Sequence, residues 1–274
     1  MIGSPAAGGG FRLPESVFAI PATRLAGRPL LIMLDVDGTL APIALLPSLA
    51  RVPDETRRIL TRLVNHPGIV VALVSGRAAT DARRLVAVDG VWAIGNHGAE
   101  VMDPAGELTV EPSMMHFESA IAAAANALAP LVDAVEDVFV ENKNWSLAVH
   151  YRAADEHLVP RLREHVTRVA HANGLRVTDG KKVFEVRPPI TINKGSAVVQ
   201  LAGKLGALGA GASVLFAGDD ATDEDAFRML RSDYPRAVTV HVGDWPDSAA
   251  EFRVDGPNEI RELLLFIAND ADRS

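Results

Sequence analysis

The sequence predicts an α/β protein with a Rossmann-like parallel-sheet core and an inserted α+β cap domain. Three observations support this fold class. Short, nearly continuous apolar runs recur along the chain, as is typical of strands buried on both faces. Helical patterns lie between several of these runs, which favours a parallel sheet. In the middle of the chain the order changes to helix, strand, strand, helix, strand, strand, which indicates a separate small module.

The elements of the core follow from these patterns. The apolar runs predict strands over residues 29–34, 69–74, 91–94, 213–217 and 237–242. The helical patterns predict helices over residues 54–66, 79–88 and 194–205. In sheets of this kind ligands bind beyond the carboxyl ends of the strands. Three of these ends carry small polar motifs, "DVDGT", "SGR" and "GDDATDED", so we expect the functional site there.

The middle of the chain predicts the insert. After a hairpin over 100–111, an Ala-rich helix is expected over 113–134, then strands over 138–143 and 145–152, a helix over 155–173 and a hairpin over 175–188. Asp179–Gly180 is a common turn pair, so the second hairpin is expected to turn there. The predicted domain boundaries are a flexible N-terminal leader (1–25), a core (26–107 and 191–274) and a cap (108–190).

Composition excludes several classes of function. The 274 residues carry a net charge of −8, so the chain lacks the basic footprint of a protein that binds nucleic acid or anionic membranes. No apolar run reaches the roughly 20 residues of a membrane span. Cysteine is absent, which excludes disulfides, thiolate metal sites and a cysteine nucleophile, and fits a reducing compartment. We therefore expect a cytoplasmic protein with a small-molecule substrate.

Two acids follow the first apolar run, in "LIMLDVDGTLAPI" (31–43). In a strand, Asp35 and Asp37 would point to the same side, where each raises the cost of ionising the other. One interpretation is a turn that leads into Gly38. The other makes Asp35 a nucleophile toward phosphorus and Asp37 a proton donor and acceptor, with Mg²⁺ neutralising the pair. The hydroxyl of Thr39 would then contact phosphate.

A second acidic motif follows the run 213–217. Asp219 and Asp223 belong to "FAGDDATDED", and one interpretation is that these acids only cap and stabilise the next helix. The alternative is that Asp219 is a metal ligand and Asp223 supports it.

Two further residues suit an anionic ligand. Ser75 in "VSGR" follows a buried strand, and it either caps the next helix or contributes to a phosphate site. Lys194 begins a predicted helix, where a cation is locally unfavourable. A lysine so placed is expected to face an anion, such as a transferring phosphoryl group.

Polar side chains share faces of the predicted insert strands. By alternation, Glu141 lies beside Lys143, His150 beside Arg152, and Glu185 beside Arg187. Such faces are either the solvated side of a half-buried sheet or a surface that recognises sugar hydroxyl groups. His97 and Glu100, in "GNHGAE", either belong to an ordinary loop or reach the same ligand.

Together these blocks resemble the haloacid dehalogenase superfamily of aspartate-nucleophile phosphatases, and within it the trehalose-6-phosphate phosphatase family. The resemblance covers about residues 30–230. It rests on the ordered blocks "LDVDGTLAPI", "VSGR", "GNHGAE", "NKNWSLAVHYR", "GKKVFEVRPP", "NKGSAV" and "FAGDDATDEDAF". It departs at Val36, where the family often has an aromatic residue, and at Ile192–Asn193. Neither departure removes a chemical group from the expected mechanism.

The resemblance implies a role for each matching residue. Asp35 is the nucleophile and Asp37 the general acid and base. Mg²⁺ is held by Asp35, Asp219 and the main-chain carbonyl of Asp37, and Asp223 supports this site. Ser75 and Lys194 hold phosphate. The side chains expected to bind the sugar under a mobile cap are Arg77, His97, Glu141, Lys143, Arg152 and Glu185.

The expected reaction is Mg²⁺-dependent hydrolysis of trehalose 6-phosphate through an aspartyl-phosphate intermediate. The same chemistry on glucosyl- or mannosyl-3-phosphoglycerate or sucrose phosphate remains an alternative, as does a non-catalytic sugar-phosphate sensor. A phosphomutase would have to protect its aspartyl-phosphate from water, and a dehalogenase has no use for Asp37.

Overall fold

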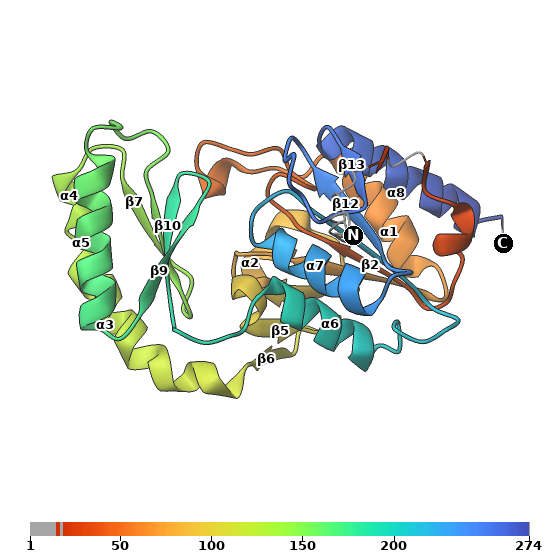
Figure 1. Ribbon diagram of the computed structural model, residues 1–274, viewed down its shortest axis with the longest axis horizontal. Coiled ribbons are helices and arrows are strands. Elements are labelled where there is room, and N and C mark those ends of the chain that lie inside the picture. Colours follow the sequence, from red (N-terminus) through yellow and green to blue (C-terminus); the bar gives the residue numbers. More distant parts are fainter. Residues whose placement is uncertain (1–14, 17–18, 274) are drawn as a thin grey trace, which may run out of the picture.

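The computed structural model describes residues 15–16 and 19–273. Residues 1–14 and 17–18 of the predicted leader lie outside this range. The described chain forms a larger core and a smaller cap, which lie side by side and are joined by two connections (Figure 1). This arrangement confirms the predicted fold class.

The core is built on one large sheet. In the described residues it has nine strands in the order β1-β13-β12-β11-β2-β3-β4-β5-β6. The first seven of these pair in parallel, and β5 and β6 are antiparallel. The strand bounds are β1 (Glu15–Ser16), β2 (Leu30–Leu34), β3 (Ile69–Val74), β4 (Trp92–Gly95), β5 (Glu100–Met102), β6 (Leu108–Val110), β11 (Ser213–Gly218), β12 (Val238–Val242) and β13 (Phe252–Val254).

Helices cover both faces of this sheet. Along β2, Leu30, Ile32 and Leu34 pack in the cluster that includes side chains of α1 (Asp54–Asn65), α2 (Ala79–Val86) and α8 (Pro257–Ala271). Leu31 and Met33 point the other way and pack with α6 (Lys194–Lys204) and α7 (Asp223–Asp233) (Figure 1). β2 is apolar on both faces, as expected for a strand in the middle of a sheet that is covered on both sides. The residues that follow it therefore lie at the carboxyl ends of the central strands.

The cap has its own sheet and its own hydrophobic core. Antiparallel strands lie in the order β7-β8-β10-β9. Leu147, Val149 and Phe184 of this sheet pack against the cap helices, which cover the face turned away from the core (Figure 1). The opposite, more polar face therefore looks toward the core. The element bounds are α3 (Glu118–Leu128), α4 (Leu131–Ala134), β7 (Phe139–Asn142), β8 (Leu147–His150), α5 (Val159–Ala172), β9 (Arg176–Gly180) and β10 (Val183–Arg187).

Two local predictions for the insert are wrong. The helix expected over 113–134 is interrupted: a 3-10 helix, Pro112–Phe117, precedes α3, and α4 begins only after Pro130. Proline cannot continue an α-helix because it lacks the N–H group and its ring clashes with the preceding turn. The second hairpin turns at Lys181–Lys182, and β9 continues through Gly180, which pairs with Val183.

One boundary of the core also differs from expectation. β6 pairs with β5, so the core sheet extends through Val110, beyond the predicted boundary at 107. β13 and α8 complete the core within its predicted range, 191–274, although no strand or helix was predicted there. No helix in the part of the chain described is both long enough and apolar enough to cross a membrane.

Candidate active site

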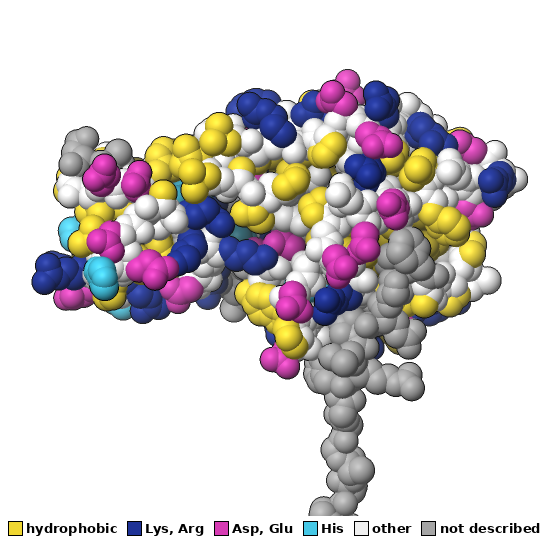
Figure 2. Space-filling model, turned by 90° about the horizontal axis from the view of Figure 1, so that it is seen from above, with side chains coloured by type: hydrophobic (Ala, Val, Ile, Leu, Met, Phe, Trp, Pro, Cys, Tyr) yellow, Lys and Arg dark blue, Asp and Glu magenta, His cyan; other side chains and the backbone are white. Residues whose placement is uncertain are grey.

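A cleft between the cap and the core collects most of the predicted site residues. Basic side chains gather where the two bodies meet, with acidic side chains beside them (Figure 2). The predicted residues that line this cleft are Asp35, Asp37, Ser75, Arg77, His97, Glu141, Lys143, Arg152, Glu185, Lys194 and Asp219. Thr39 and Asp223 are fully buried and are not among its lining residues.

The loop after β2 places the two acids of the first motif. β2 ends at Leu34, so strand alternation does not account for their common direction. The loop does so instead: Asp37 bridges to Ala41, and Gly38 has a φ of +92°. A Cβ atom at Gly38 would lie 2.2 Å from a carboxylate oxygen of Asp219. Only glycine therefore allows the loop to approach the second acidic motif so closely.

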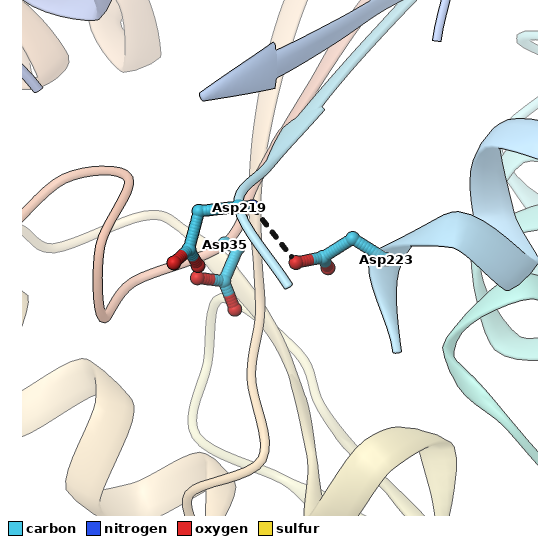
Figure 3. Close-up of side chains that lie close together, drawn as sticks. All are labelled: Asp35, Asp219 and Asp223. Atoms are coloured by element: carbon cyan, nitrogen blue, oxygen red, sulfur yellow. Dashed lines mark hydrogen bonds between the residues drawn. The ribbon is translucent and has the colours of Figure 1, made fainter. Parts of the chain in front are cut away.

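Asp35, Asp219 and Asp223 form a compact buried cluster (Figure 3). One carboxylate oxygen from each lies within 4.8 Å of the others. Burial raises the pKa of Asp35 and of Asp223 well above the ordinary range, and it raises the pKa of Asp219 to about 6. Burial therefore disfavours the charged form of each carboxyl group, and a nearby cation would favour it.

Lys194 offsets part of this negative charge. Its Nζ atom donates to Asp35 Oδ1 at 2.8 Å and to Asp223 Oδ1 at 2.8 Å. Burial opposes its charged form, but Asp220, Asp223 and Asp35 raise the pKa of Lys194 well above the ordinary value. Lys194 begins α6, whose N-terminus is capped by the side chain of Asn193. The helix thus holds a charged ammonium group under the acidic cluster.

The donor set fits a divalent cation. Asp35 Oδ2 is buried and has no partner. Asp223 is already committed, because its Oδ2 accepts hydrogen bonds from the amides of Asp219 and Asp220 at 3.0 and 3.1 Å. Asp223 therefore orients the loop, while Asp35 and Asp219 offer oxygen atoms to an ion. Carboxylate oxygens are ligands that Mg²⁺ prefers.

Asp37 is held by an arginine. Arg77 donates to Asp37 from Nε at 2.6 Å and from Nη2 at 2.7 Å, and both residues of this bidentate pair line the cleft. Ser75 does not cap α2, which was one of its two interpretations from the sequence. Its Oγ instead accepts a hydrogen bond from the amide of Arg77 at 3.1 Å. Ser75 also lines the cleft.

The polar face of the cap sheet supplies the opposite wall. Lys143 Nζ donates to Glu185 Oε1 at 3.0 Å, and His150 Nε2 lies 2.9 Å from Glu141 Oε2. Although burial opposes it, Lys143 and the neighbouring His97 lower the pKa of Glu185 below the ordinary range. Glu185 Oε2 has no partner. These groups place charged donors and acceptors along the cap side of the cleft.

His97 completes this wall from the core. Both of its ring nitrogens are buried without a hydrogen-bond partner, and Nε2 lies 3.8 Å from Glu185 Oε1. Burial lowers the pKa of His97 to about 4, so its ring is neutral near pH 7. Glu100 does not join it: Glu100 Oε1 accepts from the amide of Ala79 at 2.5 Å and caps α2.

Sequence reasoning missed Lys181. It lies in the β9–β10 turn, and its ammonium contacts the Asp219 carboxylate and donates to Asp219 O at 2.9 Å. Arg152, at the edge of the cleft, donates to Lys181 O at 2.8 Å. One pattern could have indicated Lys181. In an extended strand it would lie on the same face as Glu185 and Arg187, because the three residues are separated by even numbers of positions.

The doubly covered parallel sheet, the acids after its first central strand, the lysine of α6 and the inserted cap define a member of the haloacid dehalogenase superfamily. A family model described as Trehalose-phosphatase matches residues 33–258. The chain belongs to the trehalose-phosphatase family.

Related sequences agree with this assignment. A Mycobacterium avium trehalose-phosphate phosphatase is 33% identical over 269 residues, which cover 96% of this chain and 68% of the relative. A Zea mays trehalose 6-phosphate phosphatase is 31% identical, with 89% and 71% covered. A Mycobacterium tuberculosis protein described as an uncharacterized glycosyl hydrolase is 38% identical over 90% of this chain, but this chain spans only 19% of that relative's length.

Solved structures share the fold. A trehalose-6-phosphate phosphatase related protein superposes with a TM-score of 0.78 at 27% identity, covering 89% of this chain and 99% of the other. The C-terminal domain of a Candida albicans trehalose-6-phosphate phosphatase also gives a TM-score of 0.78, at 24% identity, with 94% and 98% covered. The second likeness concerns the fold alone.

Proposed function

We propose that the chain is a Mg²⁺-dependent phosphatase that hydrolyses trehalose 6-phosphate to trehalose and phosphate in trehalose biosynthesis. Family membership supports the reaction class. One observation of the site carries the proposal: Asp35 accepts a hydrogen bond from Lys194 and lies within 4.8 Å of an Asp219 oxygen atom, with Asp37 and polar cap side chains in the same cleft. The lack of cysteine supports a cytoplasmic location.

The first step uses the two acids of the β2 loop. Lys194 holds Asp35 Oδ1 and leaves Oδ2 without a partner. An Asp35 oxygen bonds to phosphorus while the bond between phosphorus and the sugar oxygen breaks, and Asp37 gives that oxygen its proton. Asp37 can donate a proton only after it leaves its ion pair, so we expect Arg77 to turn away when substrate binds.

The second step regenerates the enzyme. Asp37, now a carboxylate, takes a proton from a water molecule that attacks phosphorus, and the bond between Asp35 and phosphorus breaks. Lys194 and Ser75 stabilise the phosphoryl oxygens. Asp35, Asp219 and the main-chain carbonyl of Asp37 would hold Mg²⁺, with Asp223 in support. The bound ion supplies positive charge that neutralises the carboxylates and the phosphoryl group.

The cap selects the sugar in this proposal. Glu141, Lys143, Arg152 and Glu185 offer charged acceptors and donors to sugar hydroxyl groups, and His97 assists from the core. The buried oxygen of Glu185 that lacks a partner is an acceptor ready for a hydroxyl group.

A panel of phosphate esters tests this function. Phosphate release from trehalose 6-phosphate, sucrose 6-phosphate, glucosyl-3-phosphoglycerate and mannosyl-3-phosphoglycerate is measured with Mg²⁺ and with EDTA. We expect the highest kcat/KM for trehalose 6-phosphate and loss of activity in EDTA. A higher kcat/KM for another ester would overturn the substrate, and tight binding without phosphate release would favour a sensor.

A further inference from the structure

Asn96 connects the core to the cap. It follows β4 directly, is buried with 4% exposure, and does not line the cleft. Its Nδ2 donates to the main-chain oxygen of Lys143 at 3.0 Å, and its Oδ1 accepts from Ser146 Oγ at 2.8 Å. Both partners belong to the turn between β7 and β8 of the cap. Buried hydrogen bonds across 47 and 50 residues of chain indicate a specific docking contact.

The backbone of Asn96 is hydrogen-bonded to the loop that carries Ser75, a residue of the proposed phosphate site. Its φ is +47°, in the left-handed region, where asparagine is better tolerated than most residues. Its amide donates to Arg77 O at 2.7 Å, and the amide of His97 donates to Ser75 O at 3.1 Å. One residue therefore touches the loop of Ser75–Arg77 through its main chain and the cap through its side chain.

The cap end of this contact carries a buried ion pair. Lys143 begins the β7–β8 turn, and its amide donates to Ser146 O at 2.9 Å. Its side chain runs into the cleft and donates to Glu185 on β10. The hydrogen bond to the main chain of Lys143 therefore holds the position from which its side chain reaches Glu185.

We propose that Asn96 is a positioning residue for sugar recognition. By fastening the β7–β8 turn to the core, it sets the Lys143–Glu185 pair at a fixed place relative to Asp35. A substrate must span that separation, with its phosphate at Asp35 and its sugar at the cap. This inference rests on the proposed function, and it adds a specificity role for a residue that contacts neither phosphate nor sugar.

The variant Asn96→Gly tests this role, because glycine keeps the left-handed conformation and removes only the side chain. Two substrates are compared: trehalose 6-phosphate, and p-nitrophenyl phosphate, which lacks a sugar. We expect kcat/KM for trehalose 6-phosphate to fall about 10- to 100-fold, mainly through KM. The fall for p-nitrophenyl phosphate should be much smaller. Ser146→Ala removes one of the two hydrogen bonds and should give a smaller effect of the same kind.

Hydrogen exchange provides a readout that does not depend on substrate. In Asn96→Gly the amide of Lys143 should exchange faster than in the wild type, while amides of β2 and β3 keep their protection. Equal losses on both substrates, or unchanged kinetics together with unchanged exchange at Lys143, would overturn the positioning role. If the wild type hydrolyses p-nitrophenyl phosphate but not trehalose 6-phosphate, the proposed function fails, and the exchange experiment still decides the role of Asn96.

Discussion

At the scale of single residues, the two carboxylate oxygens of Asp35 have different surroundings. Lys194 occupies Oδ1, and Oδ2 is buried without a partner. Asp35→Asn keeps the shape of the side chain and removes the nucleophile. Turnover should therefore fall about a thousandfold or more. Phosphate release gives the rate, and intact mass spectrometry should detect the phosphorylated protein in the wild type but not in the variant.

The exposed acid Asp89 provides a matched control for this experiment. Asp89→Asn makes the same chemical change at the surface, outside the residues that line the cleft, and should leave turnover unchanged. Near-normal turnover in Asp35→Asn would refute the nucleophile assignment.

A buried histidine makes stability depend on pH. His241 on β12 has 1% exposure, and its Nδ1 lacks a hydrogen-bond partner. Burial lowers the pKa of His241 to about 4, whereas the unfolded chain protonates it near 6.5. Below about pH 6.5 the unfolded state binds more protons, so stability decreases as the pH falls toward 4. The loss from this group is about 2 kcal/mol between pH 7.5 and pH 5.

Urea unfolding at these two pH values measures the effect. His241→Phe should reduce the difference in the free energy of unfolding between the two conditions. Part of the difference should remain, because burial also lowers the pKa of His97 to about 4. An identical pH dependence in the variant and the wild type would show that His241 does not titrate in this range.

At the scale of elements, the β9–β10 turn brings a lysine against a proposed metal ligand. The Lys181 ammonium contacts the carboxylate of Asp219. A metal ion and an ammonium group repel each other, so Mg²⁺ must displace Lys181 from this carboxylate. Lys181→Met should therefore bind Mg²⁺ about fivefold more tightly, a modest effect because the lysine is half-exposed. Isothermal titration calorimetry measures the affinity without substrate.

The next residue is the natural control. Lys182 carries the same charge in the same turn, but it pairs with Glu156 within the cap. Lys182→Met removes an equal charge without touching Asp219 and should leave the Mg²⁺ affinity almost unchanged. Equal affinities in the two variants would contradict direct competition at Asp219.

Elements buried on both faces were the best predicted. β3 has the bounds expected from its apolar run, because a central parallel strand has no solvent face to interrupt its pattern. The β9–β10 turn was misplaced, because Phe184 and Val186 must face the cap helices, and their packing sets the register. The local preference of Asp179–Gly180 for a turn is weaker than this packing.

The site residues were likewise predictable where a local pattern encodes them and unpredictable where distant contacts place them. Alternation placed Glu141 beside Lys143 and Glu185 beside Arg187, because period two is a local property, and these side chains line one cleft. Asn96 was missed, because its partners lie far along the chain and no local pattern encodes them. Thr39 was expected to offer its hydroxyl group to phosphate; this group is buried without a partner, and Thr39 is not among the residues that line the cleft.

At the scale of the whole molecule, the cap and the core have separate hydrophobic clusters. Phe184 has 1% exposure and stacks on Tyr151 at 4.4 Å between ring centroids, within the cap. Phe184→Ala should cost about 3–5 kcal/mol and act on the cap alone. Hydrogen exchange should then show lost protection in β7–β10 and unchanged protection in β2 and β3.

The matching experiment makes the same kind of substitution in the core. Phe216 on β11 is fully buried in a different cluster, so Phe216→Ala should weaken protection in the core sheet first. Equal loss in both bodies for either variant would mean that cap and core unfold as one cooperative unit.

The two connections between cap and core restrict how the molecule opens. The chain enters the cap through residues 111–117 and leaves it through 188–193, and both crossings lie at the same end of the cap (Figure 1). Two crossings at one end would define a hinge line, so we expect any opening of the cap to be a rotation about that end. The β9–β10 turn lies at the opposite end, so such a rotation would displace it farthest. We therefore expect the cleft to open first beside Lys181 if the proposed substrate enters by such a rotation.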